Sequence, residues 1–158
     1  MRTLVTDGSE LTCRRLVRGD QALARALFRL FAQVFETPYT PLGDSYLDAL
    51  LGREDFWAMA ALEGDVVVGG LTAHRLPMTR AEVSELFLFD LAVRADRRRR
   101  GLGRALIGAL RAEATHAGID TMFVPADDED AHALDFYRAV GGVGAPVTIF
   151  TFEGRTSS

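Results

Sequence analysis

Residues 85–107 read Glu85-Leu-Phe-Leu-Phe-Asp90-Leu-Ala-Val93-Arg-Ala-Asp-Arg97-Arg-Arg-Arg100-Gly101-Leu-Gly103-Arg-Ala-Leu-Ile107. The nearly unbroken apolar run from Leu86 to Val93 is short for a helix and predicts a buried strand. After Gly101, leucine and alanine recur at helical spacing, which predicts a helix. The stretch therefore predicts a strand, a basic loop and a helix in succession.

The junction between the basic loop and the predicted helix suits a phosphate group. The first turn of a helix leaves four backbone N–H groups without intrahelical partners and carries roughly half a positive charge, so anions bind there. Two glycines let an anion approach the backbone, and arginine side chains can donate hydrogen bonds to it. The expected contacts of a diphosphate are Arg98, Arg99, Arg100, Gly101, Leu102, Gly103 and Arg104. A solvated turn is the alternative.

Two familiar phosphate-binding loops do not fit these residues. The dinucleotide fingerprint requires a third glycine three positions after Gly103, where the chain has Leu106. A Walker loop requires a lysine, and the sequence contains none.

Length and composition indicate one ordinary globular domain. The chain has 158 residues, of which 48% are hydrophobic and 25% charged, and we expect residues 1–158 to form a single domain. Residues 1–10 are polar and are expected to form a loose terminus without the apolar core of a signal peptide. The longest apolar runs, such as Val66 to Val68, are far too short to span a membrane, so no membrane association is expected. Cys13 is the only cysteine, which suits a reducing compartment, and the cytoplasm is the expected location.

The charge pattern argues against two further classes of function. A net charge of −4 disfavours general nucleic-acid binding, although the run Arg97 to Arg100 alone would allow a contact with a phosphate backbone. His74, His116 and His132 lack the spacing of metal ligands, so no metal site is expected.

The remaining elements follow from periodicity and turn residues. We expect helices over residues 21–35, 44–51, 101–117 and 131–140, with Asp20 capping the first of them. We expect strands over residues 11–17, 56–62, 66–76, 83–93, 121–124 and 147–152. Gly69 and Gly70 suggest a bulge. The strand at 121–124 follows a helical crossover and should lie parallel to the strand at 83–93.

Asp90 is the most unusual residue of the predicted central strand. Aspartate is depleted in strands, and a carboxylate among Leu88, Phe89 and Leu91 is costly unless it is paired or faces a wet cleft. A structural ion pair with a nearby arginine is therefore the alternative to a role in catalysis.

The combination of Asp90-Leu-Ala-Val93, the loop Arg98-x-x-Gly101-x-Gly103 and the later segment around Tyr137 resembles the GNAT acetyltransferase superfamily. The resemblance covers nearly the whole chain. It implies an α/β (α+β) fold: a mixed, mostly antiparallel sheet flanked by helices, with splayed parallel fourth and fifth strands. It also implies acetyl-CoA as co-substrate and, since many enzymes of this fold dimerise, allows a homodimer.

The resemblance assigns roles to particular residues. Pantetheine would pair with the backbone near Leu91, Ala92 and Val93, and a backbone N–H there would polarise the acetyl carbonyl. Asp90 would accept a proton from the amine or orient it, helped by a pKa raised on partial desolvation. Tyr137 would protonate the leaving thiolate, although a core aromatic on a helix is an equal alternative.

Within the superfamily, the chain resembles most the aminoglycoside 3-N-acetyltransferases of the gentamicin-resistance type. The resemblance rests on the strand at 85–93, on the arginine–glycine loop, and on Val124-Pro-Ala-Asp127 with Asp130 and Tyr137. It implies a cationic amine substrate held by an acidic loop, which here comprises Asp127, Asp128, Glu129 and Asp130. Glu85 is a further candidate for substrate contact. A solvated helix N-terminus is the alternative for the acidic loop.

Other functions remain compatible with these residues. The acceptor could be a polyamine, another small amine or a protein N-terminus instead of an aminoglycoside. The chain could also be a CoA-binding module without turnover, or, more remotely, a nucleic-acid-binding protein that uses Arg97 to Arg100.

Overall fold

The computed structural model describes residues 2–6 and 9–154. These residues divide into two compact units, the first ending at Pro125 and the second beginning at Ala126. The first unit contains a six-stranded sheet in the order β1-β2-β3-β4-β5-β6. Its strands are β1 (Arg2–Thr6), β2 (Ser9–Arg15), β3 (Phe56–Glu63), β4 (Val66–Pro77), β5 (Ser84–Val93) and β6 (Thr121–Phe123). All neighbouring strands are antiparallel except β5 and β6, which are parallel. The mixed, mostly antiparallel sheet is therefore confirmed, and its parallel pair carries the labels β5 and β6.

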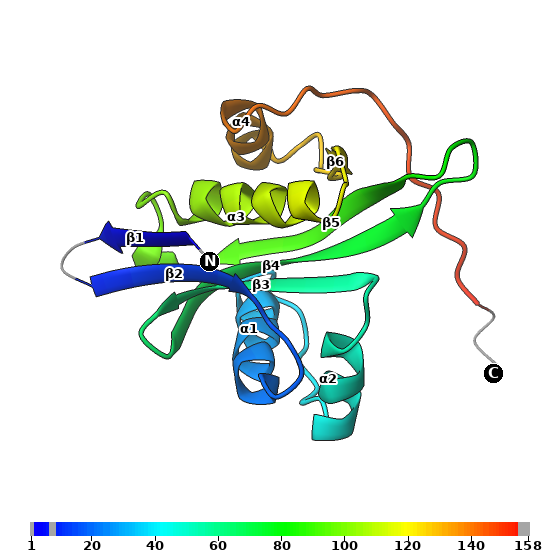
Figure 1. Cartoon of the computed structure of the whole chain (residues 1–158). Coiled ribbons are helices and arrows are strands. Elements are labelled where there is room, and N and C mark those ends of the chain that lie inside the picture. The colour runs from blue at the N-terminus through cyan, green and yellow to red at the C-terminus, as the bar shows by residue number, and fades with distance from the viewer. Residues whose placement is uncertain (1, 7–8, 155–158) are drawn as a thin grey trace. The chain divides into compact units, whose positions relative to one another are not determined.

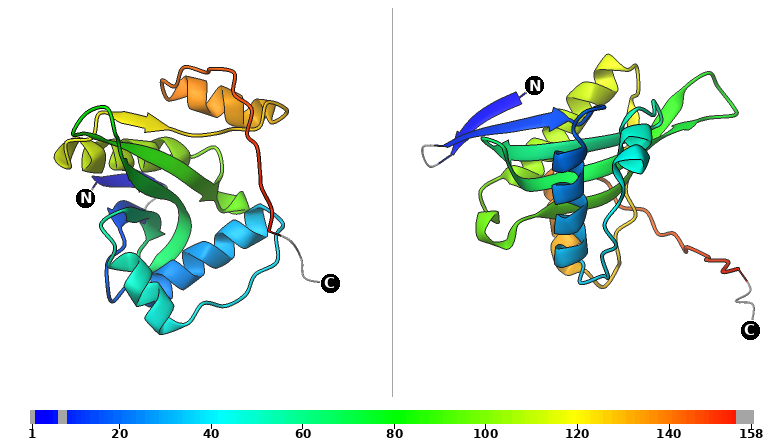
Figure 2. Two further views of the ribbon diagram at one scale, coloured as in Figure 1. Left: turned by 90° about the vertical axis from the view of Figure 1, so that its right-hand side faces the viewer. Right: turned by 90° about the horizontal axis from the view of Figure 1, so that it is seen from below.

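Three helices cover the two faces of this sheet. Helices α1 (Gln21–Val34) and α2 (Asp44–Leu51) lie on one face, and α3 (Leu102–His116) lies on the other (Figure 1). The two views at right angles in Figure 2 show α1 lying across the strands. The face toward α1 and α2 is called the α1 face below, and the opposite one the α3 face.

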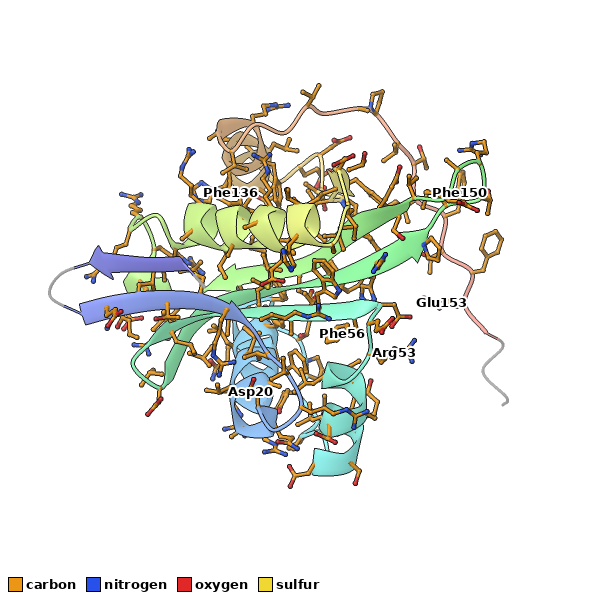
Figure 3. The ribbon with its side chains drawn as sticks, viewed as in Figure 1. Asp20, Arg53, Phe56, Phe136, Phe150 and Glu153 are labelled. Atoms are coloured by element: carbon orange, nitrogen blue, oxygen red, sulfur yellow. The ribbon has the colours of Figure 1, made fainter. Side chains whose placement is uncertain are left out.

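The side chains of the sheet alternate between these two faces, as the pleat of a strand requires. On the α1 face, alternate residues of β3 pack against the helices; Phe56, labelled in Figure 3, lies on this side. The α3 face is lined by large apolar side chains that are almost fully buried: Trp57, Met59, Leu71, Leu86 and Leu88 of the sheet, with Leu106 and Leu110 of α3. Each such side chain stabilises the fold by about 1.5–3 kcal/mol through its removal from water.

Two local expectations for the first unit differ from the structure. Residues 1–10 are not a loose terminus, since Arg2–Thr6 pairs with Ser9–Cys13 as an antiparallel hairpin, while residues 1, 7 and 8 lie outside the described residues. Asp20 does not cap α1 with its side chain, because its carboxylate instead accepts hydrogen bonds from the Arg14 guanidinium at 2.9 and 3.0 Å and from the Val17 N–H at 2.8 Å.

The second unit contains α4 (Ala131–Ala139), and residues after 142 form no regular structure up to residue 154. The strand expected at Val147–Phe152 is therefore wrong. Its β-branched and aromatic residues favour a strand by propensity, but propensity is overridden where no neighbouring strand offers a partner. The expected organisation of residues 1–158 as one domain stays a prediction.

Candidate active site

A β-bulge in β5 determines which face of the sheet carries Asp90. Opposite β5, Ala73 of β4 pairs with Leu88 and Thr72 pairs with Asp90, so Phe89 is an extra residue in the ladder. In a regular strand Asp90 would share the α3 face with Leu86 and Leu88, because side chains two residues apart point the same way. The extra residue reverses this order and brings Asp90 to the α1 face.

Asp90 has a half-buried carboxylate whose surroundings shift its pKa in opposite directions. Burial raises its pKa above the usual aspartate value, while the hydrogen bond from Thr72 and the nearby His74 lower it, so that a net increase remains. The Thr72 hydroxyl donates to Asp90 Oδ2 at 3.3 Å and accepts a bond from the Asp90 N–H, also at 3.3 Å. Within the residues that the structure describes, no arginine forms an ion pair with Asp90. An ion pair with an arginine therefore does not explain why an aspartate occupies this position in the strand.

The carboxylate lies in a cleft that is contained within the first unit. The cleft has a volume of about 630 Å³ and is lined by α1, the loop that follows it, α2, and strands β3 to β5. A volume of this size is typical of small-molecule sites, which measure about 300–1,000 Å³. Thr72, His74, Phe89 and Asp90 contribute the part of its wall that the sheet provides.

The far end of β5 has an open edge beside this cleft. Strand β6 pairs with β5 only from Glu85 to Phe87, so residues 88–93 have a partner on the β4 side and no described strand on the other. Leu91, Ala92 and Val93 lie in this open part. Unpaired strand edges present backbone N–H and C=O groups to a ligand that can pair with them. Glu85 lies at the opposite, paired end of β5 and is not among the residues that line the cleft.

The arginine run divides into a structural residue and an exposed group. The Arg97 guanidinium donates to both carboxylate oxygens of Glu63, at 2.9 and 3.1 Å, which ties the loop to the end of β3. Arg98, Arg99 and Arg100 are exposed. Arg97 is thus part of the scaffold, and the three arginines after it face solvent.

The loop backbone opens the start of α3 to a ligand. Arg99 and Gly101 have positive φ angles of 62° and 78°, and no described atom lies within 4 Å of the position that a Cβ on Gly101 would occupy. The Ala105 N–H is bonded to the Gly101 carbonyl at 2.9 Å, so the N–H groups of Leu102, Gly103 and Arg104 belong to the first turn, which has no helical acceptors. These residues fit a diphosphate, with the exposed arginines around it.

The acidic loop belongs to the second unit and organises the start of α4. Asp127 accepts a hydrogen bond from the Glu129 N–H at 2.9 Å, and Asp130 caps α4 by accepting one from the Ala133 N–H at 3.0 Å. All four acidic side chains, Asp127, Asp128, Glu129 and Asp130, are exposed. Asp127 and Asp130 therefore act at the N-terminus of a helix, which is the alternative role considered for the acidic loop. A role of the loop in substrate binding stays a prediction.

Tyr137 is a half-buried residue of α4 in the same unit. Burial and the negative charge of Asp130 both raise the pKa of its phenol above the usual value, so the hydroxyl remains protonated at neutral pH. Its ring contacts Phe136 edge to face, with the ring centres 5.1 Å apart. A proton-donating role for Tyr137 stays a prediction.

Sequence reasoning missed the residues that accompany Asp90. Thr72, only 4% exposed, is the buried polar residue among those described, yet a threonine in a strand carries no functional signal by itself. His74 carries no such signal either, because its ring partners Phe56 and Phe89 belong to other strands. The bulge at Phe89 had one available signal, since an aspartate two residues after a buried leucine is costly unless the strand changes face.

A match to a known family covers most of the chain. Residues 22–141 match the acetyltransferase (GNAT) family, to which the chain therefore belongs. It is an acyl-CoA-dependent N-acetyltransferase, and the family uses acetyl-CoA. No curated protein matches the sequence significantly.

Several solved structures share the fold over most of the chain. The aminoglycoside acetyltransferase meta-AAC0020 from an uncultured soil metagenomic sample, solved with trehalose and with sisomicin, is 33% identical, with a TM-score of 0.88 over 92% of this chain and 97% of that one. The aminoglycoside acetyltransferase HMB0005, from a similar sample, is 34% identical, with a TM-score of 0.85 over 92% and 99%. AAC(6')-Iy, at 19% identity and a TM-score of 0.76 over 91% and 98%, shows the fold alone.

The described part of the chain contains no cluster of three or more histidine, cysteine or acidic residues that could hold a metal ion. None of its helices is both long and apolar enough to cross a bilayer.

Proposed function

We propose that this acetyltransferase transfers the acetyl group of acetyl-CoA to an amine of an aminoglycoside, at the 3-N position. The observation that carries the proposal is Asp90: a half-buried carboxylate with a raised pKa in a cleft beside the open edge of β5. Identity of 33% over nearly the full length to enzymes named as aminoglycoside acetyltransferases supports the acceptor class. The 3-N position rests on the resemblance of residues 85–93 and 124–137.

The proposed reaction is a direct attack by a neutral amine on the thioester. The amine nitrogen forms a bond to the acetyl carbon, the carbon–sulfur bond breaks, and the proton lost by nitrogen passes to Asp90. The thiolate leaves with CoA and takes a proton, for which Tyr137 is the proposed donor. A raised pKa makes Asp90 a better proton acceptor than an ordinary aspartate.

The donor would be held by backbone groups and arginines. The open edge at Leu91, Ala92 and Val93 is the proposed partner of pantetheine, and a backbone N–H there would stabilise the oxyanion. Residues 98–104 are the proposed diphosphate contacts. Asp127, Asp128, Glu129, Asp130 and, at the start of β5, Glu85 are the proposed contacts of the remaining ammonium groups.

The decisive experiment measures thiol release from acetyl-CoA with sisomicin or gentamicin, a polyamine and a peptide amine. We expect the aminoglycoside to support turnover and Asp90→Asn to lower it by ~100-fold or more, as loss of a general base does. Mass and NMR spectra of the product would identify the acetylated nitrogen. Turnover with the polyamine or the peptide alone would transfer the proposal to that acceptor.

Two results would contradict the proposal more deeply. Tight binding of acetyl-CoA without thiol release for any amine would indicate a CoA-binding module instead of an enzyme. Full activity of Asp90→Asn would assign the proton to another group.

A further inference from the structure

The cleft beside Asp90 has a wall that a polycationic sugar does not require. Six of its lining residues carry a phenyl or phenol ring: Phe28, Phe31, Phe35, Tyr39, Phe56 and Phe89. These six residues are called the aromatic compartment. Leu42 and Leu50 of the α2 region extend its apolar surface.

The rings of this compartment form a connected series that ends beside the catalytic candidate. Phe28 contacts Phe31 and Phe56, with ring centres 6.1 and 6.5 Å apart. Phe56 contacts His74 at 5.5 Å, and His74 contacts Phe89 at 6.0 Å. Phe89 precedes Asp90 directly, so an apolar surface leads from α1 to the carboxylate.

The charge of the cleft is confined to one end. Among the described lining residues, Asp90 alone carries a carboxylate, and none is an arginine. A single carboxylate matches a single ammonium group. The rings of the aromatic compartment offer only apolar contact and the attraction of their faces for a cation. Phe35 and Phe89 are 44% and 59% exposed, which leaves apolar surface for a ligand to cover.

We propose that this acetyltransferase also acetylates primary amines carried on an aryl-alkyl group, with the amine at Asp90 and the aryl ring in the aromatic compartment. This inference rests on the proposed acetyl transfer at Asp90 and adds a second class of acceptor to it. The chemistry is unchanged: the amine nitrogen bonds to the acetyl carbon of acetyl-CoA, the carbon–sulfur bond breaks, and the amine proton passes to Asp90.

The test compares 2-phenylethylamine with 2-methoxyethylamine, a small polar amine, at a pH where part of each is neutral. Product formation is followed by mass spectrometry and by thiol release, with sisomicin as a parallel acceptor. We expect kcat/KM for 2-phenylethylamine to exceed that for 2-methoxyethylamine by ~10-fold or more, because covering a phenyl ring is worth that factor or more.

Two variants locate the bound ring. Phe35→Ser removes an exposed part of the aromatic compartment and should lower kcat/KM for 2-phenylethylamine by about 5- to 10-fold. Its effect on 2-methoxyethylamine should be smaller, since that amine does not reach the compartment. Tyr46→Ser removes a ring of α2 that is 59% exposed and outside the cleft, and it should change neither amine.

The outcomes separate this inference from the proposed function. Acetylation of sisomicin without reaction or competition by 2-phenylethylamine would overturn the inference alone. Acetylation of both amines at equal efficiency, or an equal effect of Phe35→Ser on both, would overturn the role of the aromatic compartment. Absence of turnover with every amine would overturn the proposed function, and this inference with it.

Discussion

The two faces of the sheet in the first unit differ in what they tolerate. The α3 face is closed by aliphatic side chains and Trp57, all nearly inaccessible to water. The α1 face carries Thr72, His74 and Asp90 next to an open cleft. Both faces draw on the same strands, and in β5 the one extra residue at Phe89 separates a leucine of the closed face from the aspartate of the open one. The position of a residue along β5 therefore does not show which face it lies on until the bulge is known.

The largest expected effect comes from placing a carboxylate on the closed face. Leu88→Asp would bury a charge where the native side chain is 1% exposed, at a cost of several kcal/mol. We expect loss of the folded protein or a large decrease in the urea midpoint. Leu88→Met, a swap of similar volume, should cost less than about 1.5 kcal/mol. A stable Leu88→Asp protein would show that the two faces do not differ as described.

A close approach on the α1 face provides the next test. A Cβ on Gly70 would lie 2.6 Å from the Met59 carbonyl oxygen and would overlap Leu27 of α1. Gly70→Ala should therefore destabilise the protein by about 1–3 kcal/mol, measured by chemical denaturation. Gly144→Ala is the control, because no described atom lies within 4 Å of its Cβ position and its φ is not positive. Equal stabilities would mean that α1 can move away from β4.

Thr72→Val tests the hydrogen bond that supports Asp90. Its loss removes an interaction that lowers the pKa of Asp90, so the acidic limb of the pH profile of kcat/KM should move to higher pH. At neutral pH we expect a decrease of about fivefold, equivalent to a net hydrogen bond of ~1 kcal/mol. Thr72→Ser, which keeps the hydroxyl, should retain the wild-type profile. If the pH profile of kcat/KM were unchanged in Thr72→Val, the role of the threonine would be limited to packing.

The smallest effect concerns the stability cost of Asp90 itself. Its pKa is higher in the folded than in the unfolded protein, so the folded protein binds this proton more tightly, and stability falls as the pH rises from the unfolded value of about 4 through the folded one. Asp90→Asn should therefore melt at a higher temperature than the wild type at pH 7. The difference should shrink toward pH 4. A lower melting temperature for Asp90→Asn at pH 7 would contradict the sign of this shift.

Periodicity and turn residues predict most elements of the first unit. The helix over 101–117 and the hairpin of β3 and β4 are found within one or two residues of their expected bounds, because apolar spacing and glycine turns act locally. A register shift between β3 and β4 lies next to Gly69, near the expected bulge. The bulge at Phe89 could not be derived in this way, since it depends on pairing with Thr72 and Ala73 of another strand.

The residues of the candidate site also divide into those that the sequence predicts and those that it does not. The loop 98–104 and Asp90 were recognisable because arginine, glycine and aspartate are unusual where they occur. The lining of the cleft was not, because Phe28, Tyr39 and Phe56 look like ordinary core residues and become neighbours only after α1 crosses the sheet. Tyr137 and the acidic loop were named from the resemblance of residues 124–137, and their roles stay predictions.

The bulge has a consequence for the gene as well as for the protein. A one-codon insertion or deletion between Leu86 and Leu88 would reverse the faces of the β5 residues on one side of the change. It would thereby turn the carboxylate of Glu85 or Asp90 toward the α3 face. The same change in the exposed turn at residues 78–83 would only alter a loop. Length variation among descendants of this gene should therefore gather in that turn and spare the codons of β5.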